Sequence, residues 1–177
     1  AAKYLHYTYD QLNTFCMDAF QKFGFSESEA RIISDVLLLS DLYGIESHGM
    51  QRLVRYHKGI EKGMIDVHAK PEIVHETPVS AVIDAHDAMG QLVSHQAMEL
   101  AIEKAKKTGM AIVSVRNSNH FGIAGYYAKM ACDQGLVGMA MTNSEAIMVP
   151  TYARMAMIGS NPIALAVPAE PYPFFFD

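Results

Sequence analysis

Several features that identify whole classes of protein are missing from this chain. It has only two cysteines, Cys16 and Cys132, both within apolar helical patterns, which is typical of buried thiols in a reducing compartment. No run of lysine and arginine occurs and the formal net charge is −5, which argues against a nucleic-acid partner. No apolar run approaches the ~18–20 residues of a membrane span, and no signal peptide is recognisable. We therefore expect a cytoplasmic protein without a membrane partner.

The short motifs of several common enzyme classes are also missing. No GxGxxG follows a strand, so the Rossmann fingerprint is absent, and neither a P-loop nor HExxH nor CxxC occurs. The eight histidines do not form ligand pairs at helical or hairpin spacing, and we predict no metal site.

The first part of the chain has helical periodicity. Apolar residues recur every three or four positions from Leu12 to Phe23, and Ser26 with Glu29 forms a capping box before a second apolar stripe. A third helix is expected over residues 47–62, followed by an extended connection with two prolines. Residues 1–76 are therefore predicted to be an N-terminal helical domain.

Strand and helix patterns alternate in the remainder. The segments "SAVIDA", "GMAIVSV", "LVGMAMTNS" and "NPIALAVP" read as strands, with helices expected over residues 90–107 and 123–134. The continuous apolar run "GMAIVSV" predicts a strand buried on both faces. The final "PYPFFFD" resembles a strand in progress, so we expect the front part of a longer protein. Residues 77–177 are predicted to be the first part of an α/β domain.

Three polar residues of the expected third helix are four positions apart. On an α-helix His48, Arg52 and Tyr56 share one face, which would present an imidazole, a guanidinium and a phenol. A guanidinium binds a carboxylate through two hydrogen bonds, and the other groups suit a hydroxyl or carbonyl. The alternative is an exposed helix face with a stray ion pair, and Arg55 competes for the role of anion ligand.

His120 follows the apolar strand "AIVSV". Ligands of open α/β sheets gather beyond the carboxyl ends of strands, and an imidazole with an ordinary pKa near 6.5 suits proton transfer. The alternative is a turn histidine that caps a helix. Ser144, in "TNS", follows the next strand and suits either a ligand or an ordinary turn.

Four segments, "ESHGMQR", "NSNHFGIAGYYAKMA", "MTNS" and "GSNPIALAVP", resemble the type-2 malate/L-lactate dehydrogenase family. The resemblance extends over essentially the whole chain. It implies an α/β fold in which a helical domain accompanies a mixed-sheet, non-Rossmann domain that binds NAD, with NADP as the alternative. It also implies a homodimer and family members about twice as long as this chain.

The resemblance also implies roles for individual residues. His120 resembles the general acid/base that acts on the substrate hydroxyl or carbonyl, and His48 lines the same site beside the cofactor and is the proton donor in some members. The remaining matches are substrate-pocket residues, with Arg52 as the carboxylate ligand, and cofactor contacts: Ser47, Arg52, Tyr56, Ser144 and Asp177. Tyr152 and Ala153 stand where the family has small residues, which leaves the substrate open.

We therefore predict an NAD(P)-dependent dehydrogenase that transfers a hydride between a nicotinamide and a small 2-hydroxy or 2-keto acid. Two alternatives from other classes stay open. One is a metal-dependent hydrolase built on His48 and His120, and the other is a non-catalytic fragment of the parent enzyme.

Overall fold

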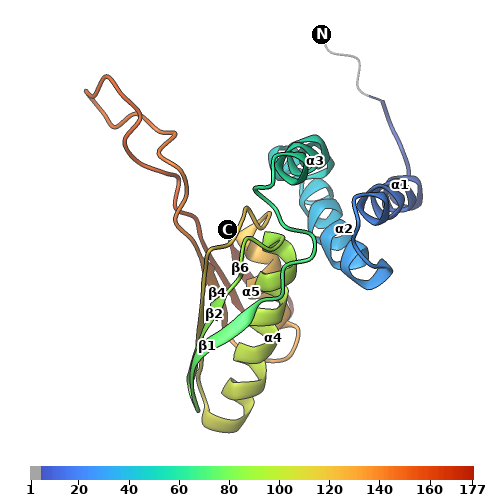
Figure 1. Cartoon of the computed structure of the whole chain (residues 1–177). Helices are drawn as coiled ribbons and strands as arrows, with labels where there is room; N and C mark the ends of the chain where they lie inside the picture. Colours follow the sequence, from blue (N-terminus) through green and yellow to red (C-terminus); the bar gives the residue numbers. More distant parts are fainter. Residues whose placement is uncertain (1–4) are drawn as a thin grey trace. The chain divides into compact units, whose positions relative to one another are not determined.

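The computed structural model describes residues 5–177, which form two compact units (Figure 1). The first ends at Gly122, and the second extends from Ile123 to Asp177. The domain boundary predicted between residues 76 and 77 stays a prediction. Within the described residues, every helix is too short or too polar to cross a membrane.

Two capped helices open the first unit. Helix α1 (Tyr9–Lys22) and helix α2 (Glu27–Leu42) each begin with a complete capping box, Thr8 with Gln11 and Ser26 with Glu29. In each box the hydroxyl accepts a hydrogen bond from a backbone N–H of the first turn, and the N3 side chain accepts one from the cap residue. The capping box predicted at Ser26 is confirmed.

The segment that carries His48 is not the α-helix that the spacing predicted. It forms two 3₁₀ turns, η1 (Glu46–His48) and η2 (Met50–Arg52), and α3 (Leu53–Glu61) begins only after them. Extended backbone at Gly49 separates the turns, and the carboxylate of Asp41 accepts a hydrogen bond of 2.8 Å from the Met50 N–H. A Cβ at position 49 would collide with the Asp41 side chain, so a local contact with α2 breaks the helix.

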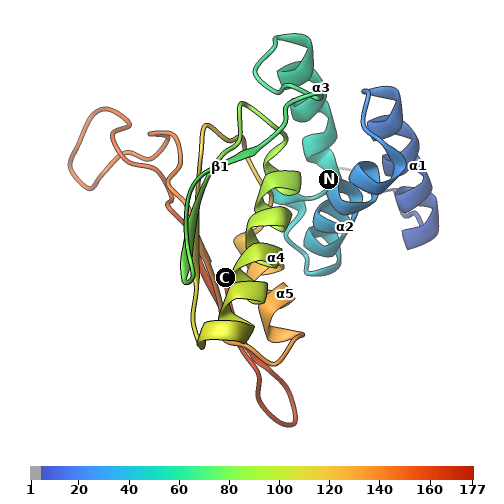
Figure 2. The same cartoon turned by 60° about the horizontal axis from the view of Figure 1, so that its bottom comes forward.

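A mixed three-stranded sheet follows in the same unit. Strand β1 (Glu72–Thr77) pairs antiparallel with β2 (Ser80–Asp84), and β2 pairs parallel with β3 (Ile112–Arg116). Helix α4 (Gly90–Thr108) connects the two parallel strands and lies along the sheet (Figure 2). Strand β1 lies in the segment that was expected to be a connection.

The prediction that "GMAIVSV" is buried on both faces is wrong. Among residues 5–177, strand β3 lies at the edge of its sheet, and its residues alternate between exposed and half-buried, with Ile112 among the exposed ones. The side chains that pack against the buried cluster are Val113 and Val115. Continuous apolar sequence therefore did not distinguish an edge strand from a central one.

The second unit is a helix packed on an antiparallel sheet. Helix α5 (Ala124–Cys132) contacts β4 (Gly138–Met141) and β5 (Ile163–Val167), and β6 (Phe174–Phe176) pairs with β5. The strands expected in "LVGMAMTNS" and "NPIALAVP" are present. An α/β fold with N-terminal helices followed by small mixed and antiparallel sheets is therefore confirmed.

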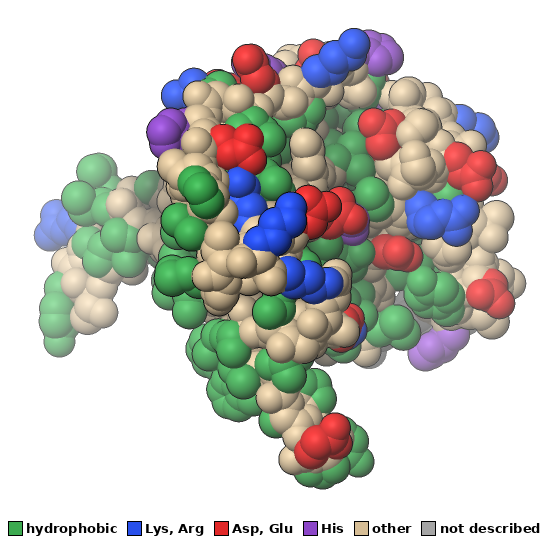
Figure 3. Space-filling model, turned by 90° about the horizontal axis from the view of Figure 1, so that it is seen from below, with side chains coloured by type: hydrophobic (Ala, Val, Ile, Leu, Met, Phe, Trp, Pro, Cys, Tyr) green, Lys and Arg blue, Asp and Glu red, His purple; other side chains and the backbone are tan. Residues whose placement is uncertain are grey.

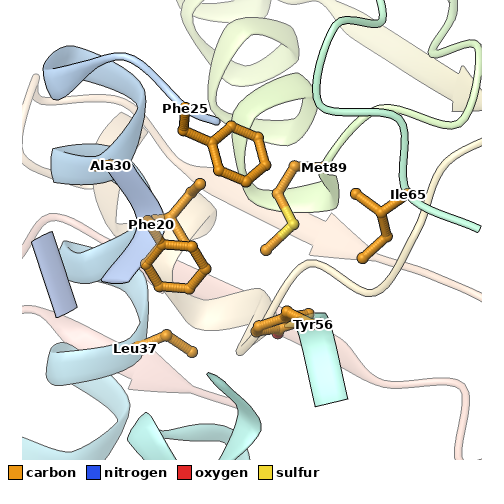
Figure 4. Close-up of a cluster of buried hydrophobic side chains, with 8 residues drawn as sticks. Phe20, Phe25, Ala30, Leu37, Tyr56, Ile65 and Met89 are labelled. Carbon is orange, nitrogen blue, oxygen red and sulfur yellow. The ribbon is translucent and has the colours of Figure 1, made fainter. Parts of the chain in front are cut away.

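The largest buried cluster of the first unit lies among its helices (Figure 4). Phe20 of α1, Leu37 of α2, Tyr56 of α3 and Met89 at the start of α4 point toward one another. The rings of Phe20 and Tyr56 are 6.5 Å apart between centroids. This packing fixes the Tyr56 ring, only 2% exposed, and thereby the position of its hydroxyl.

Candidate active site

The loop that carries His120 begins where β3 ends and is tied to the rest of the first unit by Asn119. The Asn119 amide nitrogen lies 3.0, 2.9 and 3.2 Å from the carbonyl oxygens of Met64, Asp87 and Ala88. A Cβ at Gly90 would collide with the backbone of Asn119 and His120, so a glycine is needed where α4 begins. The hydrogen bonds of Asn119 and the close approach at Gly90 thus fix the backbone at His120.

A buried carboxylate fixes the strand end that leads into this loop. Asp84, at the end of β2, accepts hydrogen bonds from the Arg116 guanidinium at 2.9 Å and from the Asn117 amide at 3.0 Å. These donors, Asn117 first, lower the pKa of the Asp84 carboxyl. Asn117 has positive φ (52°), a conformation that asparagine tolerates better than most residues. The ionised carboxylate therefore anchors the turn before His120.

His120 itself is linked to the helical core through Tyr56. The Tyr56 hydroxyl lies 2.8 Å from His120 Nδ1, and the Gln91 side-chain nitrogen donates to the same hydroxyl at 2.8 Å. The Gly122 N–H also donates to Nδ1, at 3.4 Å. Within residues 5–177, the structure gives His120 Nε2 no hydrogen bond. Nδ1 is thus held by the protein, and Nε2 is left for a ligand.

Burial determines the charge of this imidazole. Burial, and then the positive charges of Arg52, His48 and Arg55, lowers the pKa of His120 from 6.5 to about 4. His120 is therefore neutral at pH 7, well below the ordinary value on which the sequence argument relied. Burial also raises the pKa of Tyr56 to about 12, so its phenol keeps its proton.

The two predicted catalytic histidines, His48 and His120, pack against each other. The rings of His48 and His120 are stacked, with centroids 5.4 Å apart and an angle of 27° between their planes. Ser47 Oγ lies 2.9 Å from His48 Nδ1 and orients that ring. Although His48 is on a 3₁₀ turn and not on an α-helix, the structure still brings it to His120.

Two arginines supply positive charge to this site. Arg52 donates from Nε to the Ser47 carbonyl, which turns its guanidinium back toward the η1 turn. Its two terminal nitrogens make no hydrogen bond to any described residue and can accept a carboxylate in a bidentate arrangement. The charges of Arg52 and Arg55 both act on His120. The predicted residues Ser47, His48, Arg52, Tyr56 and His120 therefore form one group.

The predicted cofactor residues lie in the second unit. Ser144 Oγ accepts a hydrogen bond of 3.0 Å from the Ser160 N–H and also lies 3.4 Å from Ser160 Oγ, so Ser160 fixes the position of this hydroxyl. Asp177 Oδ2 accepts one of 2.8 Å from the Gly125 N–H in the first turn of α5, which leaves Oδ1 as an acceptor. A hydroxyl donor and a fixed carboxylate suit the phosphate and ribose groups of a dinucleotide.

Sequence reasoning did not identify Gln91, Asn119 or Asp41. Gln91 lay within an apolar helical stripe, and its polar character among buried neighbours was the available signal. Asn119 was inside a quoted motif but was not given a role. Asp41 acts through one backbone N–H, which no local pattern indicates. Among residues 5–177, no group of three or more His, Cys, Asp or Glu side chains is arranged to hold a metal ion.

Comparisons with known proteins identify the family of the chain. The family model for malate/L-lactate dehydrogenase matches residues 7–177, and the chain belongs to this family. It is 48% identical over 174 residues to malate dehydrogenase of Pyrococcus abyssi, which covers 98% of this chain and 48% of the relative. It is 43% identical over 161 residues to L-sulfolactate dehydrogenase of Methanocaldococcus jannaschii, covering 91% of this chain and 47% of the relative.

A solved structure gives the same result for the fold. The structure of malate dehydrogenase from Pyrococcus horikoshii OT3 superposes with a TM-score of 0.94 at 46% identity. The match covers 98% of this chain and 50% of that one. The chain therefore spans about half the length of the relatives that it matches.

Proposed function

We propose that the protein containing this chain is an NAD(P)-dependent dehydrogenase that interconverts a small 2-hydroxy acid and the corresponding 2-keto acid. The observation that carries the proposal is the neutral imidazole of His120, with Nε2 open to a ligand, within the electrostatic influence of Arg52, whose terminal nitrogens make no hydrogen bond to a described residue. A 2-hydroxy acid has a hydroxyl next to a carboxylate, and this pair of groups is complementary to it.

Each residue has a distinct task in this proposal. Arg52 binds the carboxylate, which orients the substrate, and His120 exchanges a proton with the oxygen on C2. His48, stacked on His120 and held by Ser47, either lines the site or is itself the proton donor. The nicotinamide, when bound, exchanges a hydride with C2. Ser144 and Asp177 would hold the cofactor through the Ser144 hydroxyl and the Oδ1 oxygen of Asp177.

The charge around His120 supports an acidic substrate with a second anionic group. Arg52 and Arg55 both place positive charge near the imidazole. Malate and sulfolactate, named for the two relatives above, each carry two acid groups. Arg55 is therefore proposed as the ligand of the second group. NAD and NADP both remain candidates, and the homodimer implied by the family stays a prediction.

The proposal is tested with the full-length gene product, because the chain spans only half of its relatives. Oxidation of NADH and of NADPH is followed by absorbance with a panel of 2-keto acids that carry one or two acid groups. We expect turnover, with the highest kcat/KM for a diacid. Absence of turnover with every acid and both cofactors would contradict the proposal. A higher kcat/KM for a monoacid would contradict the proposed role of Arg55 as the ligand of a second acid group.

A further inference from the structure

A buried amide lies behind the proposed acid/base. Gln91, in the first turn of α4, is completely buried, and its Nε2 donates to the Tyr56 hydroxyl. Its Oε1 has no hydrogen-bond partner among the described residues. Leaving a buried acceptor unpaired is costly, so an apolar side chain would pack better there. The amide therefore requires an explanation in terms of what it does to Tyr56.

The direction of each hydrogen bond follows from the Gly122 backbone. A backbone N–H can only donate, and that of Gly122 points to His120 Nδ1 across 3.4 Å, a long contact that favours an unprotonated Nδ1 without fixing it alone. Tyr56 must then donate its single proton to Nδ1, across 2.8 Å. Its oxygen is left to accept from Gln91 Nε2. A neutral imidazole with a bare Nδ1 carries its proton on Nε2.

Rotating the Gln91 side-chain amide by 180° would reverse the direction of the hydrogen bonds from Gln91 through Tyr56 to His120. Its Oε1 would then face Tyr56 and take the phenol proton, and the phenol oxygen would have to accept a proton from His120 Nδ1. That proton would point at the Gly122 N–H, which places two donors against each other. The orientation of Gln91 and the position of the His120 proton are therefore coupled through one hydroxyl.

We propose that Gln91 is a positioning residue that acts through Tyr56 to hold the proton of His120 on Nε2. Nε2 is the nitrogen without a partner in the described chain, so its proton is presented to the substrate oxygen. As that proton leaves, Tyr56 passes its own proton to Nδ1, and the ring stays a neutral imidazole. This catalytic use rests on the function proposed above, whereas the tautomer does not. The other groups that face the imidazole are the cations Arg52 and Arg55 and the ring of His48. The two guanidinium groups only donate, so neither competes for the Nε2 proton.

The tautomer can be measured directly by ¹⁵N NMR of the full-length gene product labelled at histidine. Couplings from the ring carbons distinguish a protonated from an unprotonated nitrogen, and the His120 signals are identified by their loss in His120→Asn. We expect protonated Nε2 and bare Nδ1 in the wild type. A protonated Nδ1 in the neutral ring would overturn the proposal at once.

The role of Gln91 is tested with Gln91→Glu. An ionised carboxylate only accepts, so it should take the Tyr56 proton and shift the His120 proton to Nδ1 as the pH is raised through ionisation of the new side chain. In a Tyr56→Phe background the same substitution should leave His120 unchanged, because the hydroxyl that transmits the effect is gone. Gln96→Glu is the matched control, an exposed glutamine on the same helix, and should change nothing.

Gln91→Met provides a second variant where the glutamate protein does not fold. Without a donor on its oxygen the Tyr56 hydroxyl loses its fixed direction, and both His120 tautomers should be seen. Spectra unchanged from wild type in the folded variants, as judged by thermal unfolding, would overturn the proposal. An effect of Gln91→Glu that persists in the Tyr56→Phe background would do the same.

Kinetics separate this proposal from the proposed function. If both hold, Gln91→Glu lowers kcat for keto-acid reduction by about 10²-fold or more at the pH where the tautomer has shifted. KM for NADH stays unchanged, and lowering the pH restores kcat. If the tautomer shifts as expected but the wild type reduces no 2-keto acid, the proposed function fails and the positioning role of Gln91 stands. If the wild type is active and the tautomer does not respond, the reverse is true.

Discussion

The two units hold their candidate functional residues by different means. In the unit that ends at Gly122, Tyr56 and Gln91 belong to a packed interior of large side chains and connect directly to His120. In the unit that begins at Ile123, the sheet buries alanines, and Ser144 and Asp177 lie on segments held by hydrogen bonds to backbone N–H groups. Figure 3 shows one face of the chain, on which hydrophobic side chains reach the surface in several places.

The two ways of holding a residue suit different chemical tasks. Proton transfer requires that a group be held within a few tenths of an ångström, and rigid packing provides this. Groups that hold a large cofactor are numerous and individually tolerant of small shifts. Substitutions in the two units distinguish these two ways of holding a functional residue.

Replacing His120 by asparagine should have the largest effect. Asparagine keeps a hydrogen bond toward Tyr56 but cannot exchange a proton, so kcat should fall by about 10²–10⁴-fold with little change in NADH affinity. Steady-state kinetics of the full-length gene product measure both quantities. His48→Asn is the control: if it removes the proton-dependent limb of the pH profile and His120→Asn does not, His48 is the acid and His120 only orients a ligand.

Two isoleucines, one in each unit, test the difference in packing between the units. Ile33 in α2 is 0% exposed and Ile163 in β5 is 52% exposed. Ile33→Ala should lower the free energy of unfolding by about 2–5 kcal/mol through the cavity that it leaves. Ile163→Ala should lower it by less than about 1 kcal/mol, since a surface substitution removes little burial. Denaturant unfolding measures both, and equal losses would show that β5 is buried against something else.

Arg52→Lys keeps the charge but removes the bidentate geometry. A hydrogen bond to a charged group contributes about 1.5–3 kcal/mol, so KM for the keto acid should rise about 10–100-fold. Because the side chain acts on substrate orientation, the KM for NADH should not change. Arg31→Lys, in an exposed i,i+4 pair with Glu27, is the matched control and should be neutral. Unchanged constants for the acid in both variants would make Arg55 the carboxylate ligand.

The last prediction concerns stability as a function of pH. The pKa of His120 is lowered from 6.5 to about 4 in the folded protein, so the unfolded chain binds this proton more tightly. Stability from this group is fully present above pH 6.5 and is lost as the pH falls toward 4, by up to about 1.4 kcal/mol per pH unit. Between pH 6.5 and 4, the free energy of unfolding should depend less on pH in His120→Asn than in the wild type. Identical slopes would indicate that His120 is solvated and not buried.

Local patterns in the sequence determined much of the secondary structure and the family. The capping box at Ser26 and Glu29 and the apolar strand "SAVID" depend on residues a few positions apart, and both are present as predicted. The motifs around His48 and His120 carried the family assignment, which residues 7–177 confirm. Short-range interactions are encoded by spacing, so a single sequence was sufficient for them.

Only the tertiary structure decided how the site is assembled. Tyr56 and His120 are 64 positions apart and Gln91 is 35 positions from Tyr56, and no periodicity relates them. The helix expected over residues 47–62 was broken by a contact between Asp41 and the Met50 N–H, and strand β3 proved to be an edge strand. In each case the outcome depends on which surfaces pack together, and packing joins residues that the sequence keeps apart. The proton on His120 is fixed in the same way, by the direction of hydrogen bonds that exist only once α3, α4 and the loop after β3 have met.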